Sequence, residues 1–180
     1  PHTPWDPPEP YAGMYDPADI PLPHRRPGEL EDKHPDWVEA VAQTIPATPP
    51  TSRDRKRPTG IQEAYTRLDD DQIRRMLTAY YGEVTLIDHQ VGRLMAWLDD
   101  RGLDDDTMVI FTSDHGDYLG NNWAWYKYGG LYDSLIRVPL VVRFPGVATP
   151  GLRSQALVSL IDIAPTILAA AGVAPADQMD

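Results

Sequence analysis

Two adjacent side chains that can bind a metal follow an apolar run of the sequence. Asp114 and His115 come directly after MVIFTS (residues 108–113) and directly before Gly116. A carboxylate oxygen and an imidazole nitrogen can together bind a divalent cation. Neighbouring residues of a continuing strand point to opposite faces, so the two side chains converge only if the chain turns, which Gly116 permits. The alternative is an Asp that caps a turn beside a His that packs.

A lysine surrounded by aromatic residues follows further along the chain. Lys127 lies within WAWYKYGG (residues 123–130). A partly desolvated ammonium near a metal suits a tetrahedral oxyanion such as sulfate or phosphate. The alternative is a surface lysine whose aliphatic stem covers aromatic rings. Trp123 and Trp125 have two readings as well, because they can line a pocket for an aryl or sugar leaving group or pack in the core.

Two short apolar segments are predicted to be the strands that position these residues. TMVIFTS (107–113) is rich in β-branched residues, as expected of a strand that is buried on both faces. VPLVVRF (138–144) is the second candidate and ends at Pro145-Gly146. Ligands of open α/β sheets gather at the carboxyl ends of strands. Asp114 and His115 occupy such an end.

Helices are predicted on both sides of these strands. The first begins after the acidic residues 69–71 and closes at Gly102. The second follows a short apolar stretch within 157–173, with Asp162 as its N-cap and Gly172 as its C-cap. The first helix has about seven turns, because apolar residues recur at steps of three and four: Ile73, Leu77, Tyr80, Val84, Ile87, Val91, Leu94 and Leu98.

The order helix, strand, loop, strand, helix indicates an α/β fold. Two strands cannot form the doubly covered sheet that such apolar runs require, so further strands are expected upstream or in another chain. Residues 1–60 hold 14 of the 19 prolines and are predicted to be irregular chain packed on the catalytic domain. Residues 61–180 are then the C-terminal part of that domain. Residues 47–60 are the expected mobile loop.

Composition excludes several kinds of protein. A net charge of −11 argues against a general nucleic-acid binder, which needs a basic face. The absence of cysteine excludes disulfides, Cys-ligated zinc and a cysteine nucleophile within these residues. No apolar run approaches the ~20 residues of a membrane span. A cytoplasmic or a periplasmic location stays open, because no signal peptide is visible and the first residue is Pro1.

Longer stretches of the sequence resemble a known family. YYGEVTLIDHQVGRLMAWLDDRGLDDDTMVIFTSDHGDYLG (80–120), WYKYGGLYDSLIRVPLVVRFPG (125–146), LVSLIDIAPTILAAAGV (157–173) and PHTPWDPPEPY (1–11) are similar to the sulfatase family of the alkaline-phosphatase-like superfamily. The similarity leans towards arylsulfatases and phosphonate monoester hydrolases. It implies an alkaline-phosphatase-like sandwich, in which a mixed, mostly parallel sheet lies between helices, incomplete in this chain.

The resemblance implies a role for each of four residues. Asp114 and His115 match the pair that binds a divalent metal, for which calcium is expected and manganese or magnesium are the alternatives. Lys127 matches the lysine that contacts the sulfate and stabilises charge on the ester oxygen. His2 matches the histidine that binds the sulfate or protonates the leaving group. The implied partner is a small-molecule sulfate ester, and a homo-oligomer is an open alternative.

The sequence also departs from the family pattern. The motif that yields the formylglycine nucleophile and the Asp pair that completes the metal site are both absent from these 180 residues. In the family both precede the segment that residue 1 matches, so this chain alone is expected to be inactive. Asn121-Asn122 stands where many relatives have an acid and a histidine. The predicted function is sulfate-ester hydrolysis, with phosphonate monoester or phosphodiester hydrolysis, or a non-catalytic metal-binding fragment, as alternatives.

Overall fold

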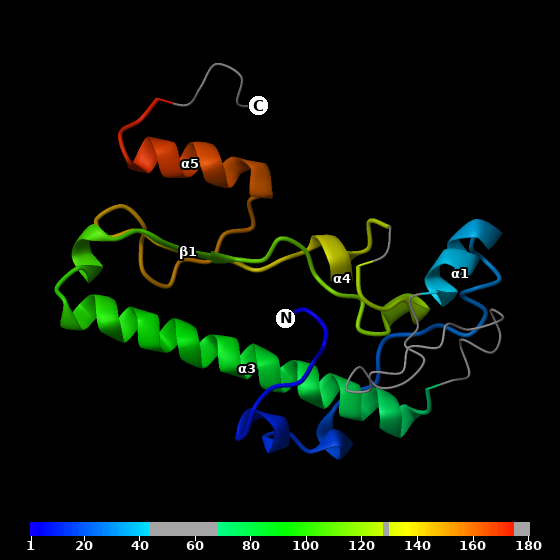
Figure 1. The fold of residues 1–180 in the computed structure, drawn as a ribbon. Coiled ribbons are helices and arrows are strands. Elements are labelled where there is room, and N and C mark those ends of the chain that lie inside the picture. The colour runs from blue at the N-terminus through cyan, green and yellow to red at the C-terminus, as the bar shows by residue number, and fades with distance from the viewer. Residues whose placement is uncertain (44–67, 128–129, 175–180) are drawn as a thin grey trace.

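The structure is a computed structural model that describes residues 1–43, 68–127 and 130–174. Its regular elements comprise α-helices, β-strands and short 3-10 helices (Figure 1). In chain order they are η1 (Tyr11–Gly13), η2 (Pro17–Asp19), α1 (Pro35–Ala42), α3 (Asp70–Asp100), η3 (Asp104–Asp106), β1 (Val109–Thr112), η4 (Asn121–Trp123), α4 (Asp133–Ile136), β2 (Leu140–Arg143), η5 (Leu160–Asp162) and α5 (Ile163–Ala170).

The long helix α3 confirms the predicted helix at both ends. It starts with a reciprocal capping box, in which the Asp69 carboxylate accepts the Gln72 N–H at 2.7 Å and the Gln72 side chain accepts the Asp69 N–H at 2.9 Å. After its last turn, Gly102 adopts φ +64°. Within the described parts of the chain, neither α3 nor another helix is apolar enough over a sufficient length to cross a bilayer.

Both predicted strands are confirmed, and they form a two-stranded antiparallel sheet in the described residues. Val109 pairs with Arg143 and Thr112 pairs with Leu140. Arg143 also forms an ion pair with Asp104 of η3 at 3.0 Å, which connects the sheet to the end of α3. The predicted parallel part of the sheet is not formed by the segments that the structure describes.

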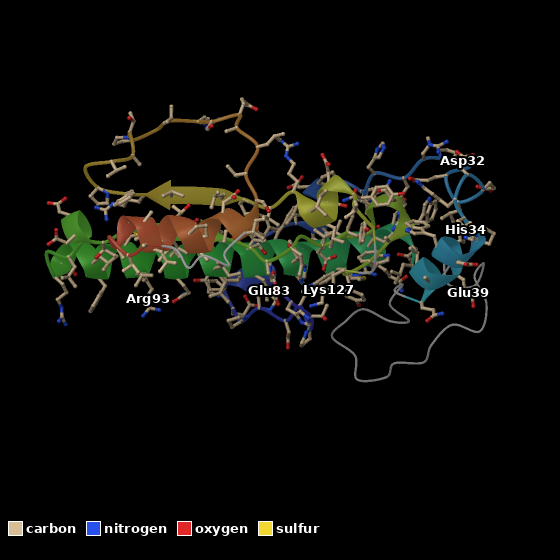
Figure 2. The ribbon with its side chains drawn as sticks, turned by 90° about the horizontal axis from the view of Figure 1, so that it is seen from above. Asp32, His34, Glu39, Glu83, Arg93 and Lys127 are labelled. Atoms are coloured by element: carbon tan, nitrogen blue, oxygen red, sulfur yellow. The ribbon has the colours of Figure 1, made fainter. Side chains whose placement is uncertain are left out.

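The sheet lies between two helical layers, as expected for an α/β sandwich. Figure 1 shows α3 on one side of the β1–β2 pair and α5 on the other, and Figure 2 shows the arrow of β2 displaced to one side of the overlapping α3 and α5. The expected burial of the strands on both faces is not found in the described residues, because Val141 and Val142 of β2 are 61% and 41% exposed.

The α5 region confirms its predicted helix, with Asp162 at the N-cap position. The carboxylate of Asp162 accepts the N–H of Ser159 at 2.6 Å and makes no capping hydrogen bond to α5. Pro165 lies in the first turn of α5, and Gly172 follows the helix with φ +69°. Asp162 therefore orders the turn that enters the helix.

The N-terminal segment packs against α3 through large apolar side chains. Trp5 is fully buried and Ile20 nearly so, which agrees with the prediction of irregular chain packed on a larger body. Figure 1 shows the segment crossing α3, with the N-terminus on the side of β1 and η1 on the other side. Gly82 of α3 allows this crossing, because a Cβ there would lie 2.5 Å from the Tyr11 carbonyl oxygen.

Helix α1 was not anticipated in the proline-rich region. It begins at Pro35, where the ring suits the first helical turn, and Val41 is fully buried against Tyr118 and Ala124. The predicted mobile loop at 47–60 and the predicted domain boundary after residue 60 fall outside the described residues.

Two buried clusters connect these elements. The larger one joins the N-terminal segment, α1, α3 and a loop after β1 (residues 117–127, hereafter the site loop), and the smaller one joins α1 to the site loop and the α4 region. The larger cluster consists of Trp5, Ile20, Ala42, Ile73, Met76, Leu77 and Trp125.

Replacing Trp5 tests whether this cluster fixes the N-terminal segment. We expect Trp5→Ala to lower the free energy of unfolding of the complete protein by about 3–5 kcal/mol, since it removes a buried indole and leaves a cavity. Urea-induced unfolding measures the change. The matched control is Trp97→Ala on α3, where the side chain is 46% exposed and the loss should stay below about 1 kcal/mol. Equal losses in the two variants would contradict the packing described here.

Candidate metal and oxyanion site

Asp114 and His115 follow β1 in a turn that is held by local hydrogen bonds. The Asp114 Oδ1 atom accepts the backbone N–H of His115 at 2.9 Å, and the Ser113 hydroxyl donates to the His115 carbonyl oxygen at 2.8 Å. The first of these bonds is the main reason why the pKa of Asp114 lies below its usual value. Asp114 is therefore held as a carboxylate, and its side chain is 84% exposed.

The imidazole of His115 is oriented so that one nitrogen faces the carboxylate of its neighbour. Its Nδ1 atom lies 2.7 Å from the Gly116 carbonyl oxygen. A carbonyl oxygen only accepts, so Nδ1 carries the hydrogen and the lone pair of the neutral ring lies on Nε2. Nε2 is 3.5 Å from Asp114 Oδ2. One cation could reach both atoms at ordinary ligand distances of about 2.0–2.6 Å.

Gly116 serves a different purpose from the one expected. Its φ does not lie in the left-handed region, so the turn does not use the conformational freedom of glycine. Its backbone approaches α4 closely, since its N–H donates to the Leu135 carbonyl oxygen at 2.7 Å and a Cβ would lie 2.0 Å from the Ser134 oxygen. The glycine is therefore required for packing the turn that carries Asp114 and His115 against α4.

The site loop folds back on itself and brings Lys127 towards this turn. The Tyr118 N–H donates to the Tyr126 carbonyl oxygen at 3.0 Å, and the Gly120 N–H donates to the Ala124 carbonyl oxygen at 2.8 Å. Lys127 directly follows Tyr126, which is hydrogen-bonded to Tyr118. Tyr118 is only a few positions from His115, so the backbone of Lys127 lies near this part of the loop. The Lys127 side chain is exposed.

The two tryptophans of the site loop have different environments. Trp125 is only 1% exposed and belongs to the larger cluster, which confirms core packing for this residue. Trp123 is half-buried, and the Arg25 guanidinium covers its ring at 4.7 Å from the centroid. Neither arrangement is an open aromatic pocket for a leaving group.

The ring of His2 is turned towards its own backbone. Nδ1 of the exposed ring lies 2.8 Å from the Thr3 carbonyl oxygen. Further along the same segment, Trp5 packs against Tyr80 of α3 and Trp125 of the site loop. The segment that carries His2 therefore meets the site loop through Trp5.

The predicted residues form a pair and two approaching segments. Asp114 and His115 are in direct contact, the Lys127 backbone is joined to the same loop, and the His2 segment lies alongside. No group of three or more histidine and acidic side chains that could hold a metal occurs among the described residues. A complete coordination sphere would need further ligands.

Asn121 and Asn122, which stand where the family pattern has an acid and a histidine, hold the N-terminal segment in this structure. The Asn121 side-chain oxygen accepts the His24 N–H at 2.8 Å. The Asn122 amide donates to Glu29 at 2.7 Å, and Glu29 is only 5% exposed. The two amides therefore have structural partners, which sequence spacing could not reveal because those partners lie more than 90 positions away in the chain.

Sequence reasoning also missed Asp117. Its carboxylate is half-buried and accepts the backbone N–H of Leu119 at 2.9 Å and that of Tyr126. The only signal in the sequence was an acid two positions after His115, which by itself indicates a solvated turn.

Comparison with known proteins shows that the fold is alkaline-phosphatase-like and gives the family of the chain. The sequence model of the sulfatase family matches residues 1–173, so the chain belongs to the sulfatase family. An arylsulfatase of Clostridium perfringens is 30% identical over 183 aligned positions, which cover 100% of this chain and 34% of that protein. The multifunctional alkaline phosphatase superfamily protein PehA of Trinickia caryophylli is 35% identical over 93% of this chain and 32% of its own length.

A solved structure confirms the predicted fold. The phosphonate monoester hydrolase of Silicibacter pomeroyi superposes with a TM-score of 0.80 at 34% identity, and the match covers 96% of this chain and 32% of that one. The chain thus spans about a third of the length of these relatives.

Gly116→Ala tests the close approach of the turn that carries Asp114 and His115 to α4. The added methyl group would collide with the Ser134 carbonyl, and we expect a loss of about 1–3 kcal/mol in the free energy of unfolding. Gly92→Ala is the control, because a Cβ there meets nothing within 4 Å on an exposed face of α3. This second change should stabilise the protein by about 0.5–1 kcal/mol. Chemical denaturation of both variants of the complete protein checks the pair, and an unaffected Gly116 variant would refute the packing argument.

Proposed function

We propose that the complete protein hydrolyses a sulfate monoester and that this chain supplies one side of its active site. The observation that supports this most strongly is the orientation of His115. Its Nδ1 is engaged by the Gly116 carbonyl, and its Nε2 lies 3.5 Å from the Asp114 carboxylate. An oriented imidazole beside an exposed carboxylate, at the end of a strand in a sulfatase-family chain, is suited to binding a cation.

Asp114 and His115 would hold a divalent metal ion. Two donors cannot fill the six to eight positions that Ca²⁺ usually takes, so the remaining ligands would come from water, substrate or residues outside 1–180. When bound, the ion polarises an ester oxygen as a Lewis acid. Calcium follows from the family resemblance, whereas the imidazole ligand is a reason to test Mn²⁺ as well as Mg²⁺.

Lys127 and His2 would act on the ester itself. The exposed ammonium of Lys127 can contact a substrate oxyanion that lies outside the site loop and neutralise the charge that develops on it. The Nε2 atom of His2 is directed away from the Thr3 carbonyl and can bind the sulfate or give a proton to the leaving oxygen. The nucleophile, a formylglycine in this proposal, would come from residues outside this chain, so the chain alone would be inactive.

Hydrolysis of a phosphonate monoester or a phosphodiester is the second candidate function. It is favoured by the likeness to the phosphonate monoester hydrolase of Silicibacter pomeroyi, which extends over nearly all of this chain. Sulfate and phosphonate esters present the same tetrahedral oxyanion to a cation and an ammonium. A non-catalytic metal-binding fragment is the third candidate, and it would be excluded by a Cys-x-Pro-x-Arg or Ser-type motif upstream of residue 1.

Paired rate measurements test the proposed reaction. We expect the complete protein to hydrolyse an aryl sulfate with a higher kcat/KM than the matching aryl phosphonate monoester, and the reverse order would favour the second candidate. Lys127→Ala should lower kcat by about 10²–10³, which is the usual cost of losing an oxyanion-stabilising group. Arg93→Ala removes a solvent-facing cation of α3 and should leave kcat unchanged. A Lys127 variant with normal kcat would refute the role of this lysine.

Metal binding is tested separately from turnover. We expect the complete protein to contain a divalent ion by elemental analysis, and chelation should abolish hydrolysis until Ca²⁺ or Mn²⁺ is restored. Asp114→Ala and His115→Ala should each weaken metal binding by at least about 100-fold in calorimetric titration. Asp100→Ala, at the exposed end of α3, is the control. Unchanged metal affinity in both site variants would show that the ion, if any, binds elsewhere.

A further inference from the structure

The half-buried carboxylate of Asp117 has no part in the proposed chemistry, yet it lies at the centre of the site loop. It accepts the N–H of Leu119 at 2.9 Å and the N–H of Tyr126. Burial raises its pKa, and these two hydrogen bonds oppose the rise. A desolvated acid that accepts two backbone N–H groups restrains the local backbone. A solvent-exposed turn does not need such a restraint.

Both donors belong to residues with unusual backbone conformations. Leu119 has φ +50° and Tyr126 has φ +60°, which is the left-handed region that side chains other than those of glycine, asparagine and aspartate seldom adopt. Such conformations persist only when the surroundings fix them. The Asp117 carboxylate holds the amide groups of these two residues, so it stabilises the points at which the loop reverses.

Tyr126 is the residue before Lys127, and it is held on both sides of its backbone. Its N–H is bound by Asp117 and its carbonyl oxygen accepts the Tyr118 N–H at 3.0 Å. The Lys127 side chain is itself exposed. The backbone of Tyr126 therefore sets the position from which this side chain starts.

We propose that Asp117 is a positioning residue that directs Lys127 towards the oxyanion by fixing the backbone of Tyr126. This inference rests on the proposed function, because it assumes that Lys127 contacts the substrate. A carboxylate suits the task better than an amide, since the nitrogen of an asparagine side chain donates and cannot accept a backbone N–H. Asp117→Asn therefore removes part of the hydrogen bonding with little change in volume.

Hydrogen exchange tests the backbone part of the proposal without any assay of activity. In the complete protein, Asp117→Asn should speed amide exchange at residues 119 and 126 by about tenfold or more, because a hydrogen bond to a charged acceptor is lost. Asp69→Ala is the matched control, since it removes a carboxylate that accepts a backbone N–H at the start of α3. This control should leave exchange in the site loop unchanged. Unaltered exchange in Asp117→Asn would overturn the proposal.

A double-mutant cycle tests whether Asp117 acts through Lys127. Asp117→Asn should lower kcat by about tenfold or more while KM changes less, since misplacement of a catalytic group by about 1 Å can cost 10²-fold. In the Lys127→Ala background the same change should lower kcat by less than about twofold, because coupled groups are not additive. A merely structural role would give equal losses in the two backgrounds, and that result would overturn the proposal.

The two proposals can fail separately. If Lys127→Ala keeps its kcat, the proposed role of Lys127 fails and the positioning role fails with it. If Lys127→Ala loses turnover but Asp117→Asn does not, only the positioning role is overturned, and the proposed function stands.

Discussion

The burial of Trp5 is the interaction on which the arrangement of the site depends. Its indole packs at 5.5 Å from the ring of Tyr80 on α3 and at 6.4 Å from the ring of Trp125 in the site loop. Three segments that are far apart in the sequence therefore meet at one side chain, and complete burial of such a ring stabilises the fold by about 1.5–3 kcal/mol. His2 lies three positions before Trp5, and Lys127 lies two positions after Trp125, so this contact brings the two predicted substrate-facing residues into one region.

Around this apolar anchor, the site is built from backbone contacts more than from contacts between side chains. Gly116 meets α4 without room for a Cβ, and the site loop closes through hydrogen bonds of its own amide groups. Asp114 and His115 are then left with exposed or half-exposed atoms that face each other. The close packing thus lies on the inner side of the turn, at Gly116. The outer side, with Asp114 and His115, stays accessible, so that a cation and an anion could bind there. This division explains why the candidate ligands can be polar, charged and accessible without a cost in buried charge.

The apolar surface of the described residues is open on β2 and near α5. Val141 on β2 and Ile161 beside α5 are apolar, and both are mostly exposed. Among the described residues, no third histidine or acidic side chain joins Asp114 and His115 in a group that could hold a metal. The chain spans about a third of the length of the relatives to which it is similar.

The sequence by itself determined the long helix and the two strands, and it singled out Asp114 and His115 as candidate metal ligands. Local rules are enough for these, since the stripe of apolar residues and the capping acid Asp69 act within a few positions of the chain. It also determined the family, because several motifs occur in the expected order. Tertiary structure alone decided that the strands are antiparallel, that Gly116 is needed for close approach, and that Asp117 holds Tyr126. These features depend on contacts between distant segments or on backbone conformation, and neither leaves a periodic or local pattern in one sequence.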